Sequence, residues 1–340
     1  MMRIRPVRSA DLDKLHALAA RSGVGLTTLP KKKEALAERI AVSEHAFATP
    51  IEKPGNEYYL FVLEDTETGA LVGTCALAAA VGMQQPFYTY TVGRVVHASP
   101  SLKIHNTVDT LYLGNDFTGC TEICTLFLDP DYRGGANGRL LSRSRFLFLA
   151  DQAKRFDNRI IAEMRGVSDD EGNSPFWESL GRKFFSMEFA EADAMCVNGN
   201  QFIAELMPHY PIYVCMLTPE AQEVIGKVHP ATEPAYNMLI EEGFRYTGHV
   251  DIFDAGPTIE SDLKNIRSVK KSLRCDWRVA PADSIEKPET YLLANCRLQD
   301  YRACLGEVNF DADGNLLVTD DIVRALELAP GEKLRACRLF

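Results

Sequence analysis

A glycine-rich loop between an apolar strand and a helical pattern is the feature that most constrains this chain. Residues 122–128 are predicted to form a short buried strand, and residues 139–156 carry leucine and phenylalanine at helical spacing. The first N–H groups of a helix lack partners within it, and the helix dipole makes that end positive. Because glycine has no Cβ, the loop backbone can approach an anion closely. The residues predicted to hold that anion are Arg133, Gly134, Gly135, Gly138 and Arg139, with Arg143 adding positive charge.

Several kinds of anion site share this layout. A P-loop is excluded because the loop does not end in Gly-Lys-Ser/Thr, and a dinucleotide fingerprint is excluded by the glycine spacing. The remaining pattern, from Leu128 to Gly138, resembles the loop that binds the pantetheine pyrophosphate of CoA in the GCN5-related N-acetyltransferase superfamily. It departs from that superfamily at Ala136, where glycine is usual. A plain glycine-rich turn without a ligand stays open as the alternative.

Charge, hydropathy and cysteine content limit the possible partners. The chain has 37 basic and 47 acidic residues, a net charge of −10, which argues against a broad nucleic-acid-binding surface. No run of about 18 apolar residues and no apolar signal core is present, so we expect a cytoplasmic protein with no membrane partner. Nine cysteines occur without a Cys-x-x-Cys pair, and no matching Cys or His cluster accompanies Cys120 and Cys124. This predicts reduced thiols and no metal site.

Helical and strand-like patterns alternate along the 340 residues, which predicts an α+β fold with helices interrupting a largely continuous sheet. Residues 174–189 and 235–253 share one pattern, a helix closed by a glycine (Gly181 and Gly243) and followed by a strand. This repeat suggests two related lobes. Residues 202–207 and 212–217 are also apolar and strand-like. The predicted units are residues 1–195, residues 196–270 and a small β-rich extension at residues 271–340.

Eight segments in fixed order are similar to those of the arginine N-succinyltransferase family, and they cover the chain up to about residue 270. They are VGLT at 24–27, VGRVVHAS at 92–99, CTLFLDPDYR at 124–133, AEMRG at 162–166, SPFWESLGRKFFSMEF at 174–189, FIAELMPHYPIY at 202–213, GKVHP at 226–230 and DIFDAGPTIE at 251–260.

This resemblance implies transfer of a succinyl group from succinyl-CoA to the α-amino group of L-arginine, which opens a bacterial route of arginine breakdown. It also implies two acyl-CoA N-acyltransferase lobes in tandem, association of two or more copies, and no permanently bound cofactor. Two alternatives remain open: an acetyl-CoA-dependent N-acetyltransferase acting on another amine, and a non-catalytic sensor of acyl-CoA or amino acids.

Acyl transfer from a thioester to an amine needs a group that donates a proton to the leaving thiolate. His229 has the residue type for this, with an ordinary pKa near 6.5, but His97 and His209 are equally suited on residue type alone. The resemblance places the proton donor of the family in the GKVHP segment, which favours His229. It also implies that Leu126 contacts succinyl-CoA through its backbone. Tyr210 and Tyr213 are weaker candidates for the acid.

The two substrates would need charged partners. A guanidinium binds best to a carboxylate and the succinyl carboxylate binds best to a cation. Glu122, Glu163 and Asp170 are the candidates for the guanidinium, and Arg165 is the candidate for the succinyl carboxylate. A structural ion pair or a solvated surface charge is the alternative for each of these four residues.

Overall fold

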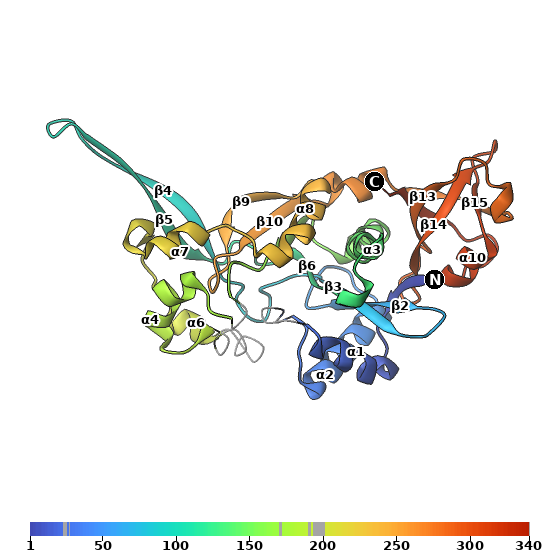
Figure 1. Cartoon of the computed structure of the whole chain (residues 1–340), viewed down its shortest axis with the longest axis horizontal. Coiled ribbons are helices and arrows are strands. Elements are labelled where there is room, and N and C mark those ends of the chain that lie inside the picture. Colours follow the sequence, from blue (N-terminus) through green and yellow to red (C-terminus); the bar gives the residue numbers. More distant parts are fainter. Residues whose placement is uncertain (23–25, 27, 170–171, 190–191, 193–200, 340) are drawn as a thin grey trace.

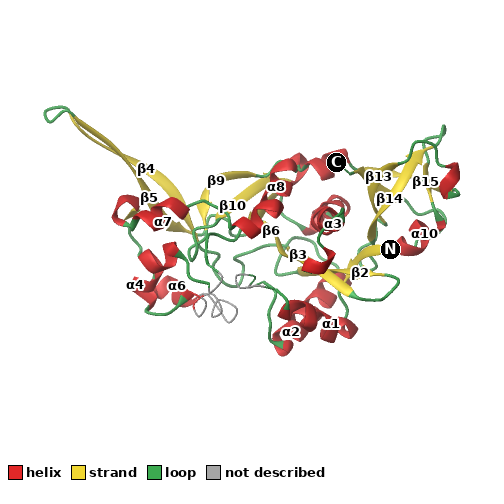
Figure 2. Ribbon diagram, in the orientation of Figure 1, coloured by secondary structure: helices red, strands yellow, loops and turns green. Residues whose placement is uncertain are grey.

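The computed structural model describes residues 1–22, 26, 28–169, 172–189, 192 and 201–339 (Figures 1 and 2). Its strands are β1 Met2–Pro6, β2 Tyr58–Asp65, β3 Leu71–Ala78, β4 Thr89–Ser99, β5 Ile104–Gly114, β6 Thr121–Leu128, β7 Arg159–Glu163, β8 Ile212–Tyr213, β9 Arg245–Val250, β10 Pro257–Asp262, β11 Leu273–Cys275, β12 Trp277–Val279, β13 Glu289–Ala294, β14 Ala303–Phe310, β15 Leu316–Val318 and β16 Leu334–Arg338. Its helices are α1 Leu12–Ala20, α2 Lys33–Ala48, α3 Asn137–Asp151, α4 Arg182–Phe185, α6 Gln201–Leu206, α7 Pro219–Val224, α8 Glu233–Glu241, α9 Arg267–Lys271 and α10 Asp320–Leu326.

The described strands join in one large sheet, which confirms the predicted combination of helices with a largely continuous sheet. The order is β11-β16-β13-β14-β1-β2-β3-β6-β7-β10-β9-β4-β5-β8, and β15 joins β12 to β14. Neighbouring strands are antiparallel except for β6 with β7 and β12 with β15. The parallel β6–β7 pair lies in the middle of this order, and the candidate site forms there.

Helices cover both faces of the central strands, and β2 shows why. Its side chains alternate between two buried clusters: Tyr59, Phe61 and Leu63 pack with α3, whereas Tyr58, Leu60 and Val62 pack with α1 and α2. An alternation of period two with apolar residues at every position is the pattern of a strand buried on both faces. In Figure 1, α1 and α2 accordingly lie below β2 and β3, and α3 lies above them.

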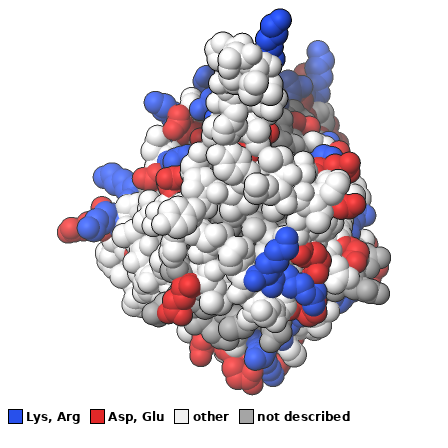
Figure 3. Space-filling model, turned by 90° about the vertical axis from the view of Figure 1, so that its left-hand side faces the viewer, with Lys and Arg blue, Asp and Glu red and all other residues white. Residues whose placement is uncertain are grey.

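The hairpin of β4 and β5 is the most extended feature of the chain. Both strands are 11 residues long, and they pair along their whole length from Thr89–Gly114 to Ser99–Ile104. Only the base is held by other strands, β9 and β8, so the tip projects from one end of the molecule (Figure 1). Leu102 at the tip is 68% exposed. Viewed from this end, most of the surface that faces the reader carries no charged side chain (Figure 3).

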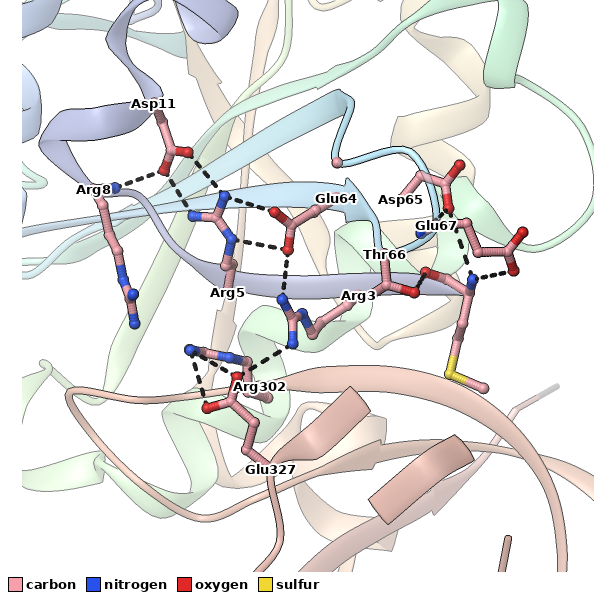
Figure 4. A network of polar contacts seen from close by, with 12 residues as sticks. Arg3, Arg5, Arg8, Asp11, Glu64, Asp65, Thr66, Glu67, Arg302 and Glu327 are labelled. Carbon is pink, nitrogen blue, oxygen red and sulfur yellow. Dashed lines mark hydrogen bonds and ion pairs between the residues drawn. The ribbon is translucent and has the colours of Figure 1, made fainter. Parts of the chain in front are cut away.

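The C-terminal strands continue the sheet, because β14 pairs with β1. A chain of ion pairs strengthens this junction (Figure 4). Arg5 binds both Asp11 and Glu64, and Arg3 bridges Glu64 at 2.7 Å to Glu327 of the C-terminal part at 3.3 Å. Burial alone would raise the pKa of Glu64, but the hydrogen bonds from Arg5 and Arg3 lower it to about 2.

Two predicted strands are wrong, and the one predicted at 212–217 is a strand only at Ile212–Tyr213, since a 3-10 turn follows at Val214–Met216. Residues 175–185 are helical without interruption, with a π turn at Trp177–Gly181 followed by α4, so no strand occupies 184–189. Residues 202–207 fall on α6. The apolar side chains Trp177 and Phe185 stack on one face of the helical segment, with ring centroids 5.3 Å apart, inside a second buried cluster. That packing outweighs the weak local preference of a short apolar run.

Gly181 does not end a helix. A Cβ built on it would lie 2.8 Å from Cδ2 of the Trp177 ring and closer still to two other ring atoms, so glycine is required there for packing. The helix ends instead at Ser186, which has a left-handed φ of 53°. The predicted helix–glycine–strand repeat therefore holds only for its second copy, formed by α8, Gly243 and β9.

Within the described residues, no helix combines the length and the apolar character that crossing a bilayer requires.

Candidate active site

A cavity of about 390 Å³ opens where β6 and β7 separate. The two parallel strands are paired only at Thr121–Ile160 and Glu122–Ile161, after which they diverge. Residues 122–127 of β6 line one side of the cavity and residues 162–165 line the other. Switch points between strands of this kind are common ligand sites, because backbone groups there are not used by a neighbouring strand.

A bulge in β6 marks the middle of the cavity wall. Thr74 faces Phe127 and Ala76 faces Cys124, so Thr125 and Leu126 together oppose one residue of β3. Thr125 takes a left-handed φ of 54°, as expected at a bulge. A bulge leaves ladder groups unpaired and available to a ligand. Leu126 lines the cavity at this point, where its predicted contact with an acyl-CoA would occur.

The glycine-rich loop lies next to this wall and is open. Helix α3 starts at Asn137 without a side-chain cap, so Gly138 and Arg139 lie in its first turn. Gly134 and Gly135 have φ of 125° and 56°, and a Cβ on either would meet nothing within 4 Å. The predicted geometry of an uncapped, positively polarised helix end with free space in front of it is therefore present.

The arginines near the loop differ in availability. Arg133 lines the cavity, and its Nε donates to the Leu128 carbonyl at 3.2 Å. Arg139 is exposed. Arg143, predicted to add charge to the anion site, is instead buried and paired with Glu241 and Glu242 of the α8 segment at 2.8 and 3.0 Å. The prediction for Arg143 is wrong because helix packing turns this side chain away from the loop.

The structure places the predicted acidic residues unequally. Glu122 and Glu163 both line the cavity, although they come from different strands, and Asp170 lies outside the described residues. Glu122 is only 8% exposed, and its carboxyl group forms no hydrogen bond or ion pair with any residue that the structure describes. Burial raises its pKa to about 7, and the charge of Arg39 opposes this rise. A buried carboxyl group without a protein partner in a cavity suits a cationic ligand.

Replacement of Glu122 by glutamine is expected to change how stability depends on pH. The folded pKa of about 7 lies above the unfolded value of 4.5, so wild type loses stability as pH rises between these values. The variant has no ionisable group at this position, so it does not show this pH-dependent loss of stability. Urea unfolding of both proteins should show the variant gaining about 2 to 3 kcal/mol relative to wild type between pH 5 and pH 8. A difference that stays constant over this range would contradict the burial of an unpaired carboxyl group at this position.

Two further acidic residues, Asp251 and Asp254, line the cavity and were not singled out from the sequence. Asp254 accepts hydrogen bonds from the backbone N–H of Gly166 at 2.7 Å and of Gly256 at 2.8 Å. Burial raises the pKa of both carboxyl groups, and the charge of Asp251 raises that of Asp254 further. The segment DIFDAGP resembles an ordinary turn, so nothing in the neighbouring sequence indicated that Asp254 would contact Gly166.

His229 lies at the rim of the cavity, beside the end of β7. Its N–H donates to the Arg165 carbonyl at 2.8 Å, and Val228 forms a bridge with Gly166. Its Nδ1 accepts from the Ala231 N–H at 3.1 Å, which leaves Nε2 to carry the proton of the neutral ring. The next residues, Ala231 and Thr232, line the cavity. The extended φ and ψ of His229, −61° and 138°, agree with the restriction expected before a proline.

The competing acid candidates lie elsewhere. His229 itself is not among the residues that line the cavity, but Ala231 and Thr232 directly after it are, whereas His97, His209, Tyr210 and Tyr213 have no such neighbours in the lining. His209 and Tyr210 are exposed. His97 belongs to the projecting hairpin, where its ring lies 5.8 Å from that of Tyr213. The geometry therefore favours His229 among these candidates.

Arg165 also lines the cavity and is half-buried. Its Nη2 donates to Ser168 Oγ at 2.7 Å, and it forms no ion pair with a carboxylate in the described part of the chain. Its charge is therefore open to a ligand carboxylate, and the succinyl carboxylate predicted for it stays a prediction.

Two family models together match most of the chain. The profile described as arginine N-succinyltransferase beta subunit matches residues 2–268, and that of the C-terminal domain of this subunit matches residues 276–338. An arginine N-succinyltransferase subunit beta of Pseudomonas aeruginosa is 49% identical over 99% of this chain and 98% of its own length. An arginine N-succinyltransferase of Escherichia coli is 46% identical over 100% of this chain and 98% of its own.

A solved structure is similar over almost the whole chain. It is the arginine/ornithine succinyltransferase subunit AI of Pseudomonas aeruginosa, which matches with a TM-score of 0.90 at 36% identity and covers 99% of this chain and 98% of its own. A similarity of this extent means that the two chains share their overall fold.

Proposed function

The chain belongs to the arginine N-succinyltransferase family, and on this premise we propose that it transfers the succinyl group of succinyl-CoA to the α-amino group of L-arginine. The products are N2-succinylarginine and CoA. The observation that carries the proposal is the single cavity between β6 and β7, which joins the anion-binding loop, the bulge and buried acidic side chains. A donor with a pyrophosphate and a cationic acceptor both have matching charges there.

The donor would bind along the loop and β6. The pyrophosphate of CoA would lie at the start of α3, held by the backbone of residues Gly134, Gly135 and Gly138 and by Arg133 and Arg139. The thioester would reach the bulge, where the backbone at Leu126 is free to contact it. CoA is a co-substrate in this proposal, and no permanently bound cofactor takes part.

The reaction would proceed by attack of the neutral α-amine on the thioester carbonyl carbon. The new C–N bond forms, the carbonyl oxygen takes the negative charge, and collapse of this intermediate breaks the C–S bond. The imidazolium form of His229 would donate the proton from Nε2 to the leaving thiolate, and its protonation at Nδ1 would release the Ala231 N–H. The ammonium formed by the attack would lose its surplus proton to water. Because a thiol has an ordinary pKa near 8.5, this donation contributes a moderate part of the rate rather than all of it.

The acceptor would lie on the opposite side of the cavity. Glu122 and Glu163 are proposed to bind its positive charges, and Asp170 remains a third candidate. Arg165 is proposed to bind a substrate carboxylate. The unpaired, buried state of Glu122 supports this arrangement, because a guanidinium or ammonium would compensate the charge that the protein leaves uncompensated.

A thiol-release assay that crosses succinyl-CoA and acetyl-CoA with L-arginine, L-ornithine and L-lysine tests the proposal. Succinyl-CoA with L-arginine is expected to give the highest kcat/KM, by about tenfold or more over acetyl-CoA with the same amine. A higher value for acetyl-CoA would identify an N-acetyltransferase instead. Binding of acyl-CoA without thiol release from any pair would identify a sensor. If L-ornithine were the best acceptor, the proposed donor would stand and only the proposed acceptor would change.

We also propose that the chain contains two acyl-CoA N-acyltransferase lobes in tandem, at residues 1–195 and 196–270, followed by the unit at residues 271–340. The boundary near residue 270 is supported by the separate C-terminal profile match from 276. The buried clusters around α3 and around Trp177 each include residues from both ranges, so they do not follow the boundary at residue 195. A cytoplasmic location belongs to the same proposal, since it suits free thiols such as Cys75 and Cys124.

Self-association is proposed to use the hairpin end of the molecule. A two-stranded hairpin is marginally stable alone, and this one exposes Val96, Leu102, Ile104 and Tyr112. It lies at the end of the molecule whose surface shows few charged side chains in Figure 3. In sedimentation experiments, Leu102→Asp should dissociate the oligomer. Leu273→Asp changes an equally exposed leucine on the far, C-terminal part and should leave the oligomer intact. Dissociation by both variants, or by neither, would contradict an interface at the hairpin.

A further inference from the structure

Arg145 of α3 is a buried cation that the proposed mechanism does not use. It is 2% exposed and lines the cavity between β6 and β7. Its guanidinium donates from Nε to the Ser142 carbonyl at 3.0 Å, from Nη2 to Ser142 Oγ at 3.3 Å and from Nη1 to the Cys124 carbonyl at 3.3 Å. A guanidinium has five N–H groups, so these bonds leave two without an acceptor among the described residues.

The other buried arginines of the described chain have carboxylate partners. Arg5 binds Asp11 and Glu64, Arg143 binds Glu241 and Glu242, and Arg302 lies near Glu327. Arg145 forms no ion pair with any described carboxylate. Burial of an uncompensated guanidinium is strongly unfavourable, so its presence in the wall of a substrate cavity needs an explanation beyond packing. An anionic ligand would supply the missing counter-charge.

The position of Arg145 agrees with the length of a succinyl group. Its Nη1 contacts the carbonyl of Cys124, and the proposed thioester contact Leu126 lies two residues further along β6. Two residues of a strand span about 7 Å. A four-carbon acyl chain anchored at the bulge therefore reaches back to the region of the guanidinium. The loop arginines lie in the other direction, toward the pyrophosphate.

We propose that Arg145 binds the free carboxylate of the succinyl group and thereby selects succinyl-CoA over donors that lack a terminal charge. The inference rests on the proposed function, because it assumes a succinyl donor seated along β6. With Arg145 in this role, the half-buried Arg165, which the sequence predicted for the succinyl carboxylate, binds the carboxylate of the L-arginine acceptor instead. The two substrates carry two carboxylates, and the cavity then has one cation for each.

The test compares kcat/KM for succinyl-CoA and for butyryl-CoA, which has a chain of the same length without the carboxylate, with L-arginine as acceptor. Arg145→Gln is expected to lower the value for succinyl-CoA by about 10²-fold or more and to change that for butyryl-CoA by less than about threefold. The preference of the enzyme for succinyl-CoA would then largely disappear. Arg165→Gln is the matched control, and it should raise KM for L-arginine while the donor preference stays unchanged.

If Arg145 only supported the β6 bulge, its replacement would lower kcat/KM for succinyl-CoA and for butyryl-CoA by the same factor, and that result would overturn the proposal. So would an unchanged preference in Arg145→Gln, or loss of the preference in Arg165→Gln instead. If Arg145→Gln does not fold, Arg145→Lys, which keeps the charge, should retain the preference with a lower kcat/KM, and its loss there would count against the proposal. Failure of the proposed function is separable, because it would appear in the wild-type protein as no preference for succinyl-CoA.

Discussion

His229→Asn is expected to lower kcat with saturating succinyl-CoA and L-arginine by a factor of about 10² to 10⁴, with the fold preserved. In the wild-type protein, the Ala231 N–H donates a hydrogen bond to His229 Nδ1. The side-chain oxygen of asparagine can accept the same bond, so the turn that begins at residue 230 keeps its cap. Asparagine has no group that exchanges a proton near neutral pH. Thiol release under saturating conditions measures kcat, and thermal unfolding should give a Tm close to that of wild type.

His209→Asn is the matched control for this substitution. His209 is an exposed histidine that does not line the cavity, so its replacement should leave kcat within about twofold of wild type. A near-normal kcat in His229→Asn would remove His229 from the chemistry and leave thiolate departure to solvent. An equal loss in both variants would point to an effect on the fold rather than on proton transfer.

Gly256→Ala is expected to destabilise the protein by about 3 to 5 kcal/mol and to abolish activity. A Cβ on Gly256 would lie 2.5 Å from the Gly166 nitrogen and closer still to the Met164 carbonyl oxygen. Both are backbone atoms, and neither can move freely, because Gly166 donates to Asp254 and its neighbour Val228 is bridged to it. Arg165 lies next to Gly166, and His229 follows Val228, which is bridged to Gly166. A shift of the backbone at Gly166 therefore displaces two proposed site residues.

Thermal unfolding measures the effect of Gly256→Ala, with an expected fall in Tm of about 6 to 15 °C. Gly55→Ala is the control, because only the flexible carboxylate of Glu57, at 3.3 Å, approaches the added Cβ there. Its change in the free energy of unfolding should stay within about 0.5 kcal/mol. A stable and active Gly256→Ala protein would mean that the two backbone segments do not cross as closely as described.

Local patterns predicted the central strands and helices well, and failed where a short apolar run had no strong periodicity. The strand 122–128, the loop and helix α3 follow from apolar spacing and glycine placement, which act over neighbouring residues. Residues 184–189 and 202–207 were predicted as strands, because a short apolar run is compatible with both a buried strand and a buried helix. Tertiary contacts with the second buried cluster decided between them.

The sequence by itself determined the family, the anion-binding loop and the residue types that the chemistry needs. Only the tertiary structure decided which charges meet a partner. Glu122 and Glu163 are about forty residues apart, yet they line one cavity because β6 and β7 are paired at their starts and then diverge. Arg143 and Arg145 are two positions apart on α3. Helix α8 neutralises the first, whereas the second faces the bulge of β6, where the protein offers it no carboxylate. Spacing along one helix sets the direction of a side chain, but the counter-charge comes from whichever element packs against it.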